Sequence, residues 1–391
     1  DVYKRQAIDT ILEFCTLKQE GRIKAVIATG CLAERYRDEM KKEIPELDAV
    51  VGIGSNGKIC DIIREILLDK QAVCSYGAKT ELSMEGGRII STEPFYAYIK
   101  IAEGCSNNCT YCAIPSIRGK YRSRRMEDIV KEARWLAENG VTELVVVAQD
   151  TTRYGEDIYG KSMLPELLTA LCEIDGFKWI RTLYCYPERI TDELLDVIAK
   201  EDKLVKYLDM PIQHCDKTIL KRMNRHGDRE TLTALIKKIR EKIPNVTLRT
   251  TLITGFPGET KEQFEELCEF VKEIRFERLG CFAYSPEEGT PAEKFEDQVP
   301  LKDRERRAEI IMEEQMIISD SLNEAALDSE VEVVCEGFDR YAECYYGRSQ
   351  ADAPEIDGKI FFLSEDKVRV GEYVKVKIDD TMDYDLIGSK M

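Results

Sequence analysis

The sequence lacks any long apolar run. No stretch approaches the roughly 20 apolar residues that cross a membrane, and residues 1–6 do not begin an apolar segment of the signal-peptide kind. These two absences predict a soluble, cytoplasmic protein that has no membrane partner.

Positive charge is also scarce. The 391 residues include 57 lysines and arginines against 74 aspartates and glutamates, which gives a formal net charge of −17. General nucleic-acid binding requires a basic surface that contacts phosphates, so this balance disfavours it and suits a basic partner instead. The negative charge is concentrated late in the chain, because residues 324–391 contain seventeen acidic and eight basic residues, a net charge of −9.

Cysteine, in contrast, is abundant, and three of the fourteen cysteines fall in one short loop. Cys105, Cys109 and Cys112 follow an apolar run at residues 95–102 with the spacing C-x3-C-x2-C. A closed zinc site usually takes four ligands from two separated pairs, and no second pair lies nearby. Three close thiolates suit an iron–sulfur cluster that leaves one iron open to a ligand. Polar residues between the thiols argue against a buried apolar group, and so many thiols favour a reducing compartment.

The same loop carries Tyr111 directly before its third cysteine. With this aromatic residue the loop resembles the signature of the radical S-adenosylmethionine (SAM) enzymes. The resemblance implies that the three thiolates hold a 4Fe–4S cluster and that SAM binds to its fourth iron. Such a cofactor cleaves SAM to a radical that removes an unactivated hydrogen atom, which side chains alone do not achieve.

Hydrophobic periodicity from residue 94 onward predicts a regular alternation of strands and helices. Strands are expected at residues 95–102, 142–148, 179–186, 205–210, 247–253 and 279–284. Helices are expected between them at residues 126–139, 164–175, 191–200, 216–243 and 261–275. Six β/α units imply a parallel sheet with right-handed crossovers, and they are too few to close an eight-stranded barrel. We therefore predict an α/β fold whose central part is an open, partial (β/α)6 barrel.

Segments of a different pattern flank this barrel. The first 80 residues are predicted to be the later part of an α/β parallel-sheet domain, and a break rich in Gly, Ser and charge at residues 70–94 is predicted to connect the two. A long charged helix is expected at residues 300–326. The period-two pattern beyond it predicts a small antiparallel β-barrel. The predicted domains are residues 1–80, 92–322 and 324–391.

Polar residues follow several predicted strands, where the chemistry of such folds is located. Gln149 and Asp150 end the second strand and either hydrogen-bond the methionine part of SAM or cap a loop. Thr254 and Gly255 begin a glycine-bearing segment after the fifth strand, where glycine allows close approach of the backbone to a ligand. The alternative for that segment is an ordinary helix entry. Tyr284 ends the sixth strand.

Three further features have open roles. Gln213 and His214 end the fourth strand, and His214 is one of only two histidines, so a structural and a catalytic role are equally open. The basic run at residues 118–125 is either a solvated face or a site for an anionic group such as a carboxylate. Cys31 follows a strand of the first segment, where a free cysteine is most often a small buried apolar side chain.

Longer segments, taken in chain order, resemble the radical SAM methylthiotransferases, which end in a small β-barrel called the TRAM domain. The segments that carry this resemblance are residues 30–33, 103–119, 123–124 and 254–259. Within the family, the segments that resemble the RimO branch are residues 148–152, 184–187, 209–214, 282–290, 347–349 and 352–358. The resemblance implies a transferase that adds a methylthio group to the β-carbon of an aspartate on the twelfth small-subunit ribosomal protein. A ribosomal protein is a basic partner, which suits the acidic C-terminal segment.

The resemblance also implies two 4Fe–4S clusters, SAM and an electron donor. It assigns the SAM cluster to Cys105, Cys109 and Cys112, and SAM contacts to Tyr111, Gln149, Asp150, Thr254, Gly255 and Tyr284. In the family three N-terminal cysteines hold an auxiliary cluster that carries the transferred sulfur, and Cys31 alone matches one of them. We therefore expect an N-terminally truncated sequence, in which Cys15, Cys60 and Cys74 are conceivable but disfavoured replacements.

Two other functions stay open at this point. The first is methylthiolation of an adenosine in transfer RNA, as in the sister branch of the family; the net charge of −9 over residues 324–391 disfavours this partner. The second is a non-catalytic binding module whose cysteines hold a structural metal ion.

Overall fold

The computed structural model describes residues 2–69, 73–82 and 84–391. These residues form two compact units. The smaller unit contains the described residues up to Arg88 together with Glu103–Asn108 and Cys112–Arg122, and the larger unit contains Ile89–Ala102, Cys109–Tyr111 and Ser123–Met391. The three predicted domain boundaries stay predictions, and residues 70–72 and 83 of the predicted connection lie outside the described residues.

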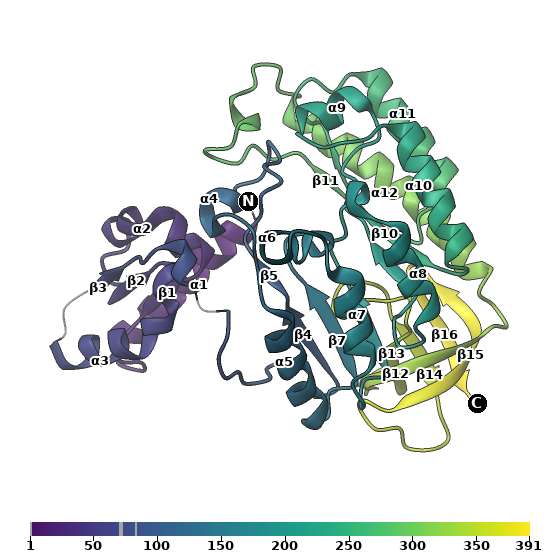
Figure 1. The fold of residues 1–391 in the computed structure, drawn as a ribbon, viewed down its shortest axis with the longest axis horizontal. Helices are drawn as coiled ribbons and strands as arrows, with labels where there is room; N and C mark the ends of the chain where they lie inside the picture. Colours follow the sequence, from purple (N-terminus) through teal and green to yellow (C-terminus); the bar gives the residue numbers. More distant parts are fainter. Residues whose placement is uncertain (1, 70–72, 83) are drawn as a thin grey trace. The chain divides into compact units, whose positions relative to one another are not determined.

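The smaller unit is a three-stranded parallel sheet with helices, as predicted for the first segment. Its strands are β1 (Ile27–Thr29), β2 (Ala49–Val51) and β3 (Val73–Ser75), of which only the first two were predicted. Its helical elements are α1 (Val2–Gln19), α2 (Cys31–Glu43), η1 (Ile53–Lys58), α3 (Ile59–Asp69), η2 (Lys79–Glu81) and α4 (Ile114–Arg118), drawn in purple and blue in Figure 1. All three residues of β2 are apolar and buried, as expected for a strand of a parallel sheet that is covered on both faces.

The larger unit contains the six predicted strands, all paired in parallel. They are β4 (Tyr96–Lys100), β7 (Glu143–Val147), β8 (Trp179–Thr182), β9 (Tyr207–Asp209), β10 (Thr247–Thr254) and β11 (Arg278–Ala283). They form two three-stranded sheets, in the orders β4-β7-β8 and β11-β10-β9, and a parallel bridge between Ile180 and Leu204 lies between β8 and β9. The predicted α/β architecture with six β/α units is confirmed.

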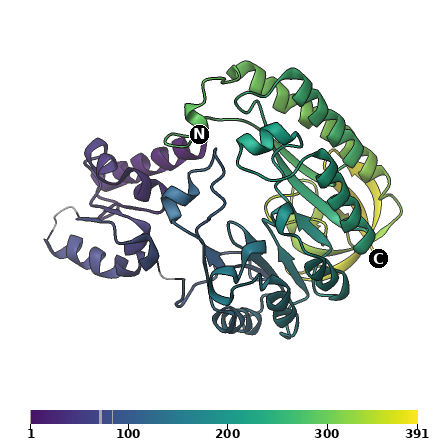
Figure 2. The same ribbon diagram turned by 45° about the horizontal axis from the view of Figure 1, so that its top comes forward.

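Helices follow most of these strands and lie along the outer side of the sheets in Figure 2. They are α5 (Met126–Glu138), α7 (Leu164–Cys172), α8 (Asp192–Lys200), α9 (Lys217–Arg222), α10 (Arg229–Lys242) and α11 (Lys261–Ile274). Short elements complete this part of the chain: β5 (Ala102–Glu103), β6 (Arg122–Ser123), η3 (Thr151–Arg153), α6 (Glu156–Tyr159), η4 (Pro187–Arg189) and η5 (Ala292–Lys294). Among the described residues, no helix is long and apolar enough to cross a membrane.

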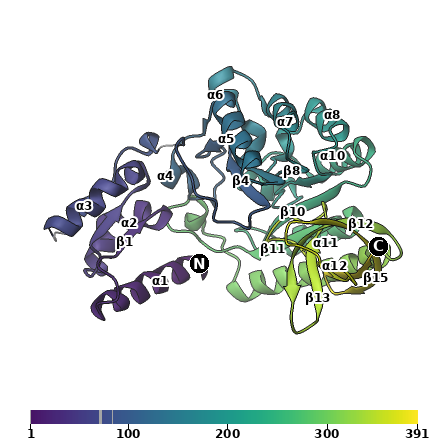
Figure 3. The ribbon, with the colours of Figure 1, turned by 90° about the horizontal axis from the view of Figure 1, so that it is seen from below.

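The long charged helix is α12 (Leu301–Glu324), which packs along β10 and β11 and contacts the C-terminal barrel. That barrel, shown in yellow in Figure 3, consists of β12 (Glu330–Asp339), β13 (Cys344–Arg348), β14 (Ile360–Leu363), β15 (Tyr373–Met382) and β16 (Asp385–Lys390). The predicted barrel is present and closed. One detail of the prediction was wrong: the barrel is not purely antiparallel, because β14 and β16 pair in parallel. The fifth strand, β16, was not predicted.

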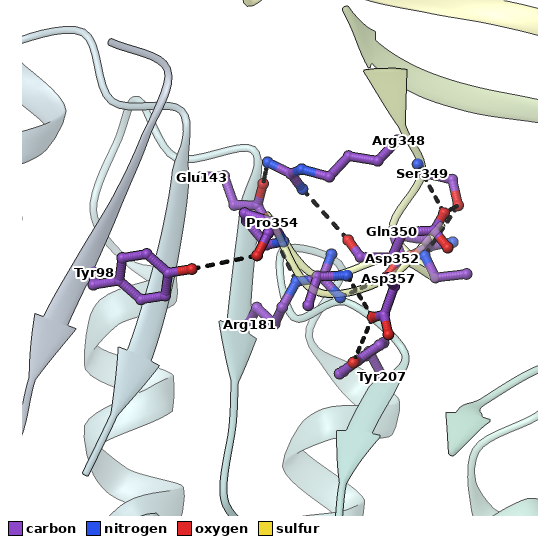
Figure 4. A network of polar contacts seen from close by, with 12 residues as sticks. Tyr98, Glu143, Arg181, Tyr207, Arg348, Ser349, Gln350, Asp352, Pro354 and Asp357 are labelled. Carbon is purple, nitrogen blue, oxygen red and sulfur yellow. Dashed lines mark hydrogen bonds and ion pairs between the residues drawn. The ribbon is translucent and has the colours of Figure 1, made fainter. Parts of the chain in front are cut away.

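Buried charges join the C-terminal barrel to the parallel strands of the larger unit near their amino ends (Figure 4). Glu143, the first residue of β7, is fully buried and forms ion pairs with Arg181 on β8 and Arg348 on β13. Arg181 also donates to the Gln350 carbonyl at 2.9 Å. Tyr207 on β9 donates to Asp357 at 2.7 Å. Residues 348–357 of the C-terminal barrel therefore cover the amino ends of three strands.

Apolar side chains also pack between the C-terminal barrel and the parallel sheets of the larger unit. One buried cluster combines Trp179 and Val205 from the sheets with Val334 from β12, and the Trp179 ring meets Tyr373 edge-on at 4.8 Å between centroids. Because buried aromatic rings contribute large apolar areas, this packing makes the C-terminal barrel part of the core of the larger unit.

We expect Glu143→Gln to destabilise the larger unit. The substitution keeps the side-chain volume but leaves the buried Arg181 and Arg348 without their shared carboxylate. Removing one partner from a buried ion pair costs about 3–5 kcal/mol. Chemical denaturation followed by tryptophan fluorescence measures the change, since Trp179 lies in the adjacent cluster.

Lys178→Gln is the matched control for that experiment, because the Lys178–Glu332 pair joins the same two parts but is about 40% exposed. Its expected cost is below about 1 kcal/mol. Equal effects of the two substitutions would contradict the role assigned to Glu143.

Candidate functional site

The first part of the cysteine loop is fixed by the segment that follows the loop. The Cys105 N–H donates to the Gly119 carbonyl at 3.1 Å. Gly104 has a φ of +77°, and a Cβ at this position would lie 2.4 Å from the Lys120 carbonyl oxygen. Glycine is therefore required immediately before the first cysteine, because any other side chain would push the two segments apart.

The middle of the loop, Cys109–Tyr111, packs within the larger unit. Thr110 donates its N–H to the Met223 carbonyl at 3.0 Å. The Tyr111 ring meets Phe256 edge-on, with 6.4 Å between centroids. Burial, and then the neighbouring Cys109, raises the pKa of Tyr111 well above its usual value, so this phenol stays protonated.

The loop offers three cysteines, the residues that hold iron–sulfur clusters. None of the three cysteines is in a disulfide, and Cys105 and Cys109 are almost fully buried. In the part of the chain that the structure describes, no three His, Cys, Asp or Glu side chains form a group that could hold one metal ion. Each cysteine of a 4Fe–4S site ligates a different iron, so its thiolates do not converge on one ion. The ligand roles of Cys105, Cys109 and Cys112 stay a prediction.

The glycine segment and the end of β11 come together as the sequence suggested. Tyr284 donates its N–H to the Thr254 carbonyl at 2.8 Å. Gly255 has a φ of +67°, and a Cβ there would lie 2.2 Å from Arg304 Cγ. The Tyr284 hydroxyl is buried and finds no hydrogen-bond partner among the described residues. Thr254, Gly255 and Tyr284 thus share the carboxyl ends of neighbouring strands, with one polar group available to a ligand.

The glycine segment contains the predicted helix entry, whereas its contact with a ligand stays a prediction. Thr260 begins α11 with a capping box to Gln263, which is the helix entry. Glu259 has another role, because its Oε2 accepts from the Gly255 N–H at 2.8 Å and its Oε1 pairs with Arg307 at 2.7 Å. The buried Glu259 carboxylate therefore fixes the glycine turn against α12.

Gln149 and Asp150 follow β7 and differ in their surroundings. The Gln149 Oε1 atom is buried without a hydrogen-bond partner among the residues described, so it can accept from a ligand. Asp150 is fully buried, and its Oδ1 accepts from the Thr152 hydroxyl at 2.6 Å. Asp150 lies at the N-cap position of η3 but makes no side-chain cap hydrogen bond there, and its carboxylate bonds a side chain of its own loop. Gln149, in contrast, keeps a vacant acceptor.

His214 is fully buried and occupies a structural position. Its Nδ1 accepts from the Asp216 N–H at 2.9 Å, so a neutral ring carries its proton on Nε2. Nε2 lies 3.6 Å from Glu259 Oε2, beyond ordinary hydrogen-bond length. Gln213, with a φ of +72°, pairs with Leu252 in an isolated parallel bridge.

Two arginines of the basic run have partners within their own units. Within the smaller unit, Arg118 donates to Glu103 Oε1 at 2.8 Å and to Cys31 Sγ at 3.2 Å. Within the larger unit, Arg124 pairs with Glu132 at 2.7 Å. These partners are carboxylates and a thiol, and the role of the run in binding an anionic group stays a prediction.

Cys31 begins α2 and is partly exposed. Its contact with Arg118 differs from the apolar burial that is usual for a free cysteine. Cys15 is buried in the apolar core of the smaller unit, and burial raises the pKa of its thiol. Cys60 and Cys74 are exposed, and neither joins Cys31 in a potential metal-binding group among the described residues.

Sequence reasoning missed one buried charge in the larger unit, in the turn that follows α9. Arg225 is 5% exposed and lies in the turn after α9. Its guanidinium stacks on the Tyr186 ring, 4.2 Å from the centroid. No sequence signal distinguishes it, because it stands among other polar residues and burial of a turn arginine depends on the tertiary fold.

Comparisons with known proteins agree with these features. Residues 99–271 match the Radical SAM superfamily model, and residues 329–390 match the TRAM domain model. The chain is 50% identical over 385 residues to the ribosomal protein uS12 methylthiotransferase RimO of Clostridioides difficile (strain 630), covering 98% of this chain and 86% of that protein. It is 48% identical over 386 residues to the RimO protein of Thermoanaerobacter sp. (strain X514), covering 98% of this chain and 87% of that protein.

Among solved structures, the chain is similar to TsrM, a radical S-adenosylmethionine methyltransferase from Kitasatospora setae. The TM-score is 0.53 at 15% sequence identity, and the match covers 70% of this chain and 59% of the other. At this identity the likeness shows a shared fold.

We expect Glu259→Gln to loosen the glycine turn. The amide removes the charge that pairs with Arg307 and weakens the hydrogen bond from Gly255. Loss of charged hydrogen bonds in a buried site costs about 1.5–3 kcal/mol, which urea denaturation measures. Glu265→Gln removes the exposed pair with Lys261 on the same helix, and we expect it to cost less than about 0.5 kcal/mol. An equal cost for both variants would count against Glu259 as the support of the turn.

Proposed function

The chain belongs to the RimO family of radical SAM methylthiotransferases that act on ribosomal protein uS12, and from this membership we propose which residues perform the reaction and on which atom. The enzyme modifies uS12 and uses a 4Fe–4S cluster and SAM, as the family does. We propose the β-carbon of an aspartate as the acceptor. The observation that carries the proposal is the identity of 46–50% over 98% of the chain to several RimO proteins.

We propose Cys105, Cys109 and Cys112 as ligands of the SAM cluster. A bound cluster with SAM supplies the one-electron chemistry that activates an unreactive carbon–hydrogen bond. The chain positions the ligands: Gly104 allows close packing before Cys105, and Thr110 fixes the centre of the loop against Met223. An external one-electron donor is proposed as a partner.

We propose that SAM contacts come from both sheets. Gln149 offers a vacant carbonyl oxygen, which suits the SAM amino group. Tyr284 offers a buried hydroxyl, and Thr254 and Gly255 offer backbone at a turn that has no room for a side chain. The proposed set of SAM contacts also includes Tyr111 and Asp150. Burial of these groups excludes water and strengthens each polar contact.

A second, auxiliary cluster is proposed with Cys31 as one ligand. The supporting contact is the hydrogen bond of 3.2 Å from Arg118 to Cys31 Sγ, which differs from the apolar burial that is usual for a free cysteine. Arg118 also contacts Glu103, the residue at the beginning of the cysteine loop. The same arginine therefore links the proposed auxiliary ligand to the loop of the SAM cluster.

The proposed domains are residues 1–80 for the auxiliary cluster, 92–322 for the radical SAM core and 324–391 for the TRAM domain. We propose that the acidic TRAM segment, with a net charge of −9, favours encounter with a basic ribosomal protein. The same charge disfavours transfer RNA as a substrate.

We expect anaerobic reconstitution with iron and sulfide to load about four irons on the SAM cluster site. The reduced protein should then cleave SAM to deoxyadenosine. Cys109→Ala should lose this cluster absorbance and the cleavage together, because the cluster needs all three thiolates. A colourless protein with one zinc, or cleavage that survives Cys109→Ala, would contradict the ligand assignment.

Substrate choice is tested with a full-length version of the protein that is reconstituted in the same way. Incubation with uS12 should add a methylthio mass to an aspartate-containing peptide, detected by mass spectrometry, and incubation with transfer RNA should add none. Cys344→Ser is a suitable control variant, because Cys344 lies on β13 of the C-terminal barrel. Modification of transfer RNA alone would overturn the proposed substrate.

A further inference from the structure

One edge of the parallel sheets has backbone groups that point away from the fold. β11 is the outermost strand of its sheet, and among the described residues it pairs only with β10. The Tyr284 N–H donates to the Thr254 carbonyl of β10 at 2.8 Å. Because the backbone groups of successive strand residues alternate in direction, every second residue before Tyr284 also faces β10. The N–H and C=O groups of Leu279, Cys281 and Ala283 therefore point outward.

This outward edge of β11 has no hydrogen-bond partner in the described part of the chain. The outermost strand of the other sheet differs. On β4 the Tyr96 carbonyl accepts from the Thr92 hydroxyl at 2.6 Å. The Lys100 carbonyl of the same strand accepts from Arg124 Nη1 at 2.8 Å. An unpaired row of backbone groups, such as the one on β11, is a template for pairing with another segment.

A cavity of about 320 Å³ follows the amino half of this edge. It is lined by the consecutive residues 277–280, together with Gln315 of α12 and Tyr384 of the C-terminal barrel. Neighbouring residues of a strand direct their side chains to opposite faces, so a cavity that contacts consecutive residues lies along the strand edge. The space beside β11 is therefore open to an additional segment.

The carboxyl half of β11 carries an exposed aromatic ring and leads to the proposed SAM site. Phe282 is 61% exposed, although strands of parallel sheets are usually covered on both faces. Tyr284, a proposed SAM contact, follows in the next turn of the chain. A segment paired with β11 lies along this strand, so one of its residues reaches the end at which SAM is proposed to bind.

Charge around the cavity favours a basic occupant. The arginines that line it are each paired with a buried aspartate: Arg249 with Asp209 at 2.8 Å, and Arg278 with Asp352 at 2.6 Å. At its rim, burial and then the nearby Asp320 and Asp383 raise the pKa of Tyr384. The lining arginines are thus compensated, and the rim carries negative charge that attracts a basic segment.

We propose that the outward edge of β11 binds an extended segment of uS12 as an additional strand, which is β-augmentation. The inference rests on the proposed function, because that function supplies a basic protein with a target aspartate. Backbone hydrogen bonds to Leu279, Cys281 and Ala283 hold the segment, and the Phe282 ring packs on its side chains. The register of the pairing places the aspartate at the carboxyl end of β11.

The first test uses the full-length, reconstituted protein and a uS12 peptide that contains the target aspartate. A series of such peptides carries one N-methylated amide at each successive position, and fluorescence anisotropy measures their affinities. Alternate amides of a bound strand donate to β11, so we expect losses of roughly threefold to tenfold at every second position and little change between them. Losses without this period of two, or no losses, would overturn the pairing.

The second test locates the segment on β11. Cys281→Pro removes an outward N–H and leaves the bonds to β10 in place, a substitution that edge strands tolerate. We expect it to weaken binding of the peptide roughly tenfold, whereas Cys281→Ser keeps the N–H and should bind the peptide as the unmodified protein does. A folded Cys281→Pro that binds as tightly as Cys281→Ser contradicts the proposal.

A side-chain variant keeps the test decisive if the proline variant does not fold. Phe282→Ala removes the exposed ring without opening a core, and we expect it to weaken binding about fivefold. Trp135→Ala is the matched control, because it removes an aromatic ring that is 38% exposed on α5 and should leave the affinity unchanged. Equal affinities of these two variants would count against β11 as the site.

The remaining outcomes separate the possible occupants. A dimer of the unmodified protein that Cys281→Pro dissociates would assign the edge to a second copy and overturn the uS12 assignment. Binding of uS12 that none of these changes weakens would remove the edge from the proposal but leave the proposed substrate in place. If the unmodified protein binds no uS12 peptide at all, the proposed function fails together with the pairing.

Discussion

The buried carboxylate of Glu143 is the interaction on which the larger unit depends. It lies at the first position of β7 and pairs with arginines from β8 and from the C-terminal barrel. A charge in this position is stable only while both guanidiniums stay in place. The carboxylate therefore joins three elements that are distant in sequence, and it makes the C-terminal barrel a base for the parallel strands in addition to any role in binding a partner.

The two ends of the parallel strands have different roles: the amino ends carry buried ion pairs, and the carboxyl ends carry the proposed ligand-binding residues. β7 begins at Glu143, in the charged base, and Gln149, with its vacant acceptor, follows its other end. The same division holds on β10, which is followed by the strained Gly255 turn. In parallel α/β folds the loops after the strands carry function while the opposite end is free to be optimised for packing. Incomplete hydrogen bonding at Gln149, Tyr284 and Arg225 is accordingly found on the functional side.

Much of this organisation could be predicted from the sequence. β7 is almost wholly apolar because both of its faces are covered, and the cysteine spacing with Tyr111 predicted a radical SAM enzyme, which the family match confirms. The sequence could not show that the Asp150 carboxylate bonds the Thr152 hydroxyl, that Arg118 and Arg124 have separate partners, or that Arg225 is buried. Each of these depends on which residues distant in sequence come close. The parallel pairing of β14 and β16 was missed for a similar reason, since strand pattern gives burial but not strand partners.

Closure of the C-terminal barrel has a consequence for recognition. Its five strands form a complete ring, so their backbone N–H and C=O groups are used internally. A ribosomal protein segment therefore has no open strand edge to extend here, and β-augmentation, a common way of binding an extended peptide, is not available on this surface. Contact with the barrel falls to side chains, among which acidic residues outnumber basic ones by seventeen to eight over residues 324–391, and is thus adjustable by ionic strength and by single substitutions without any change to the fold.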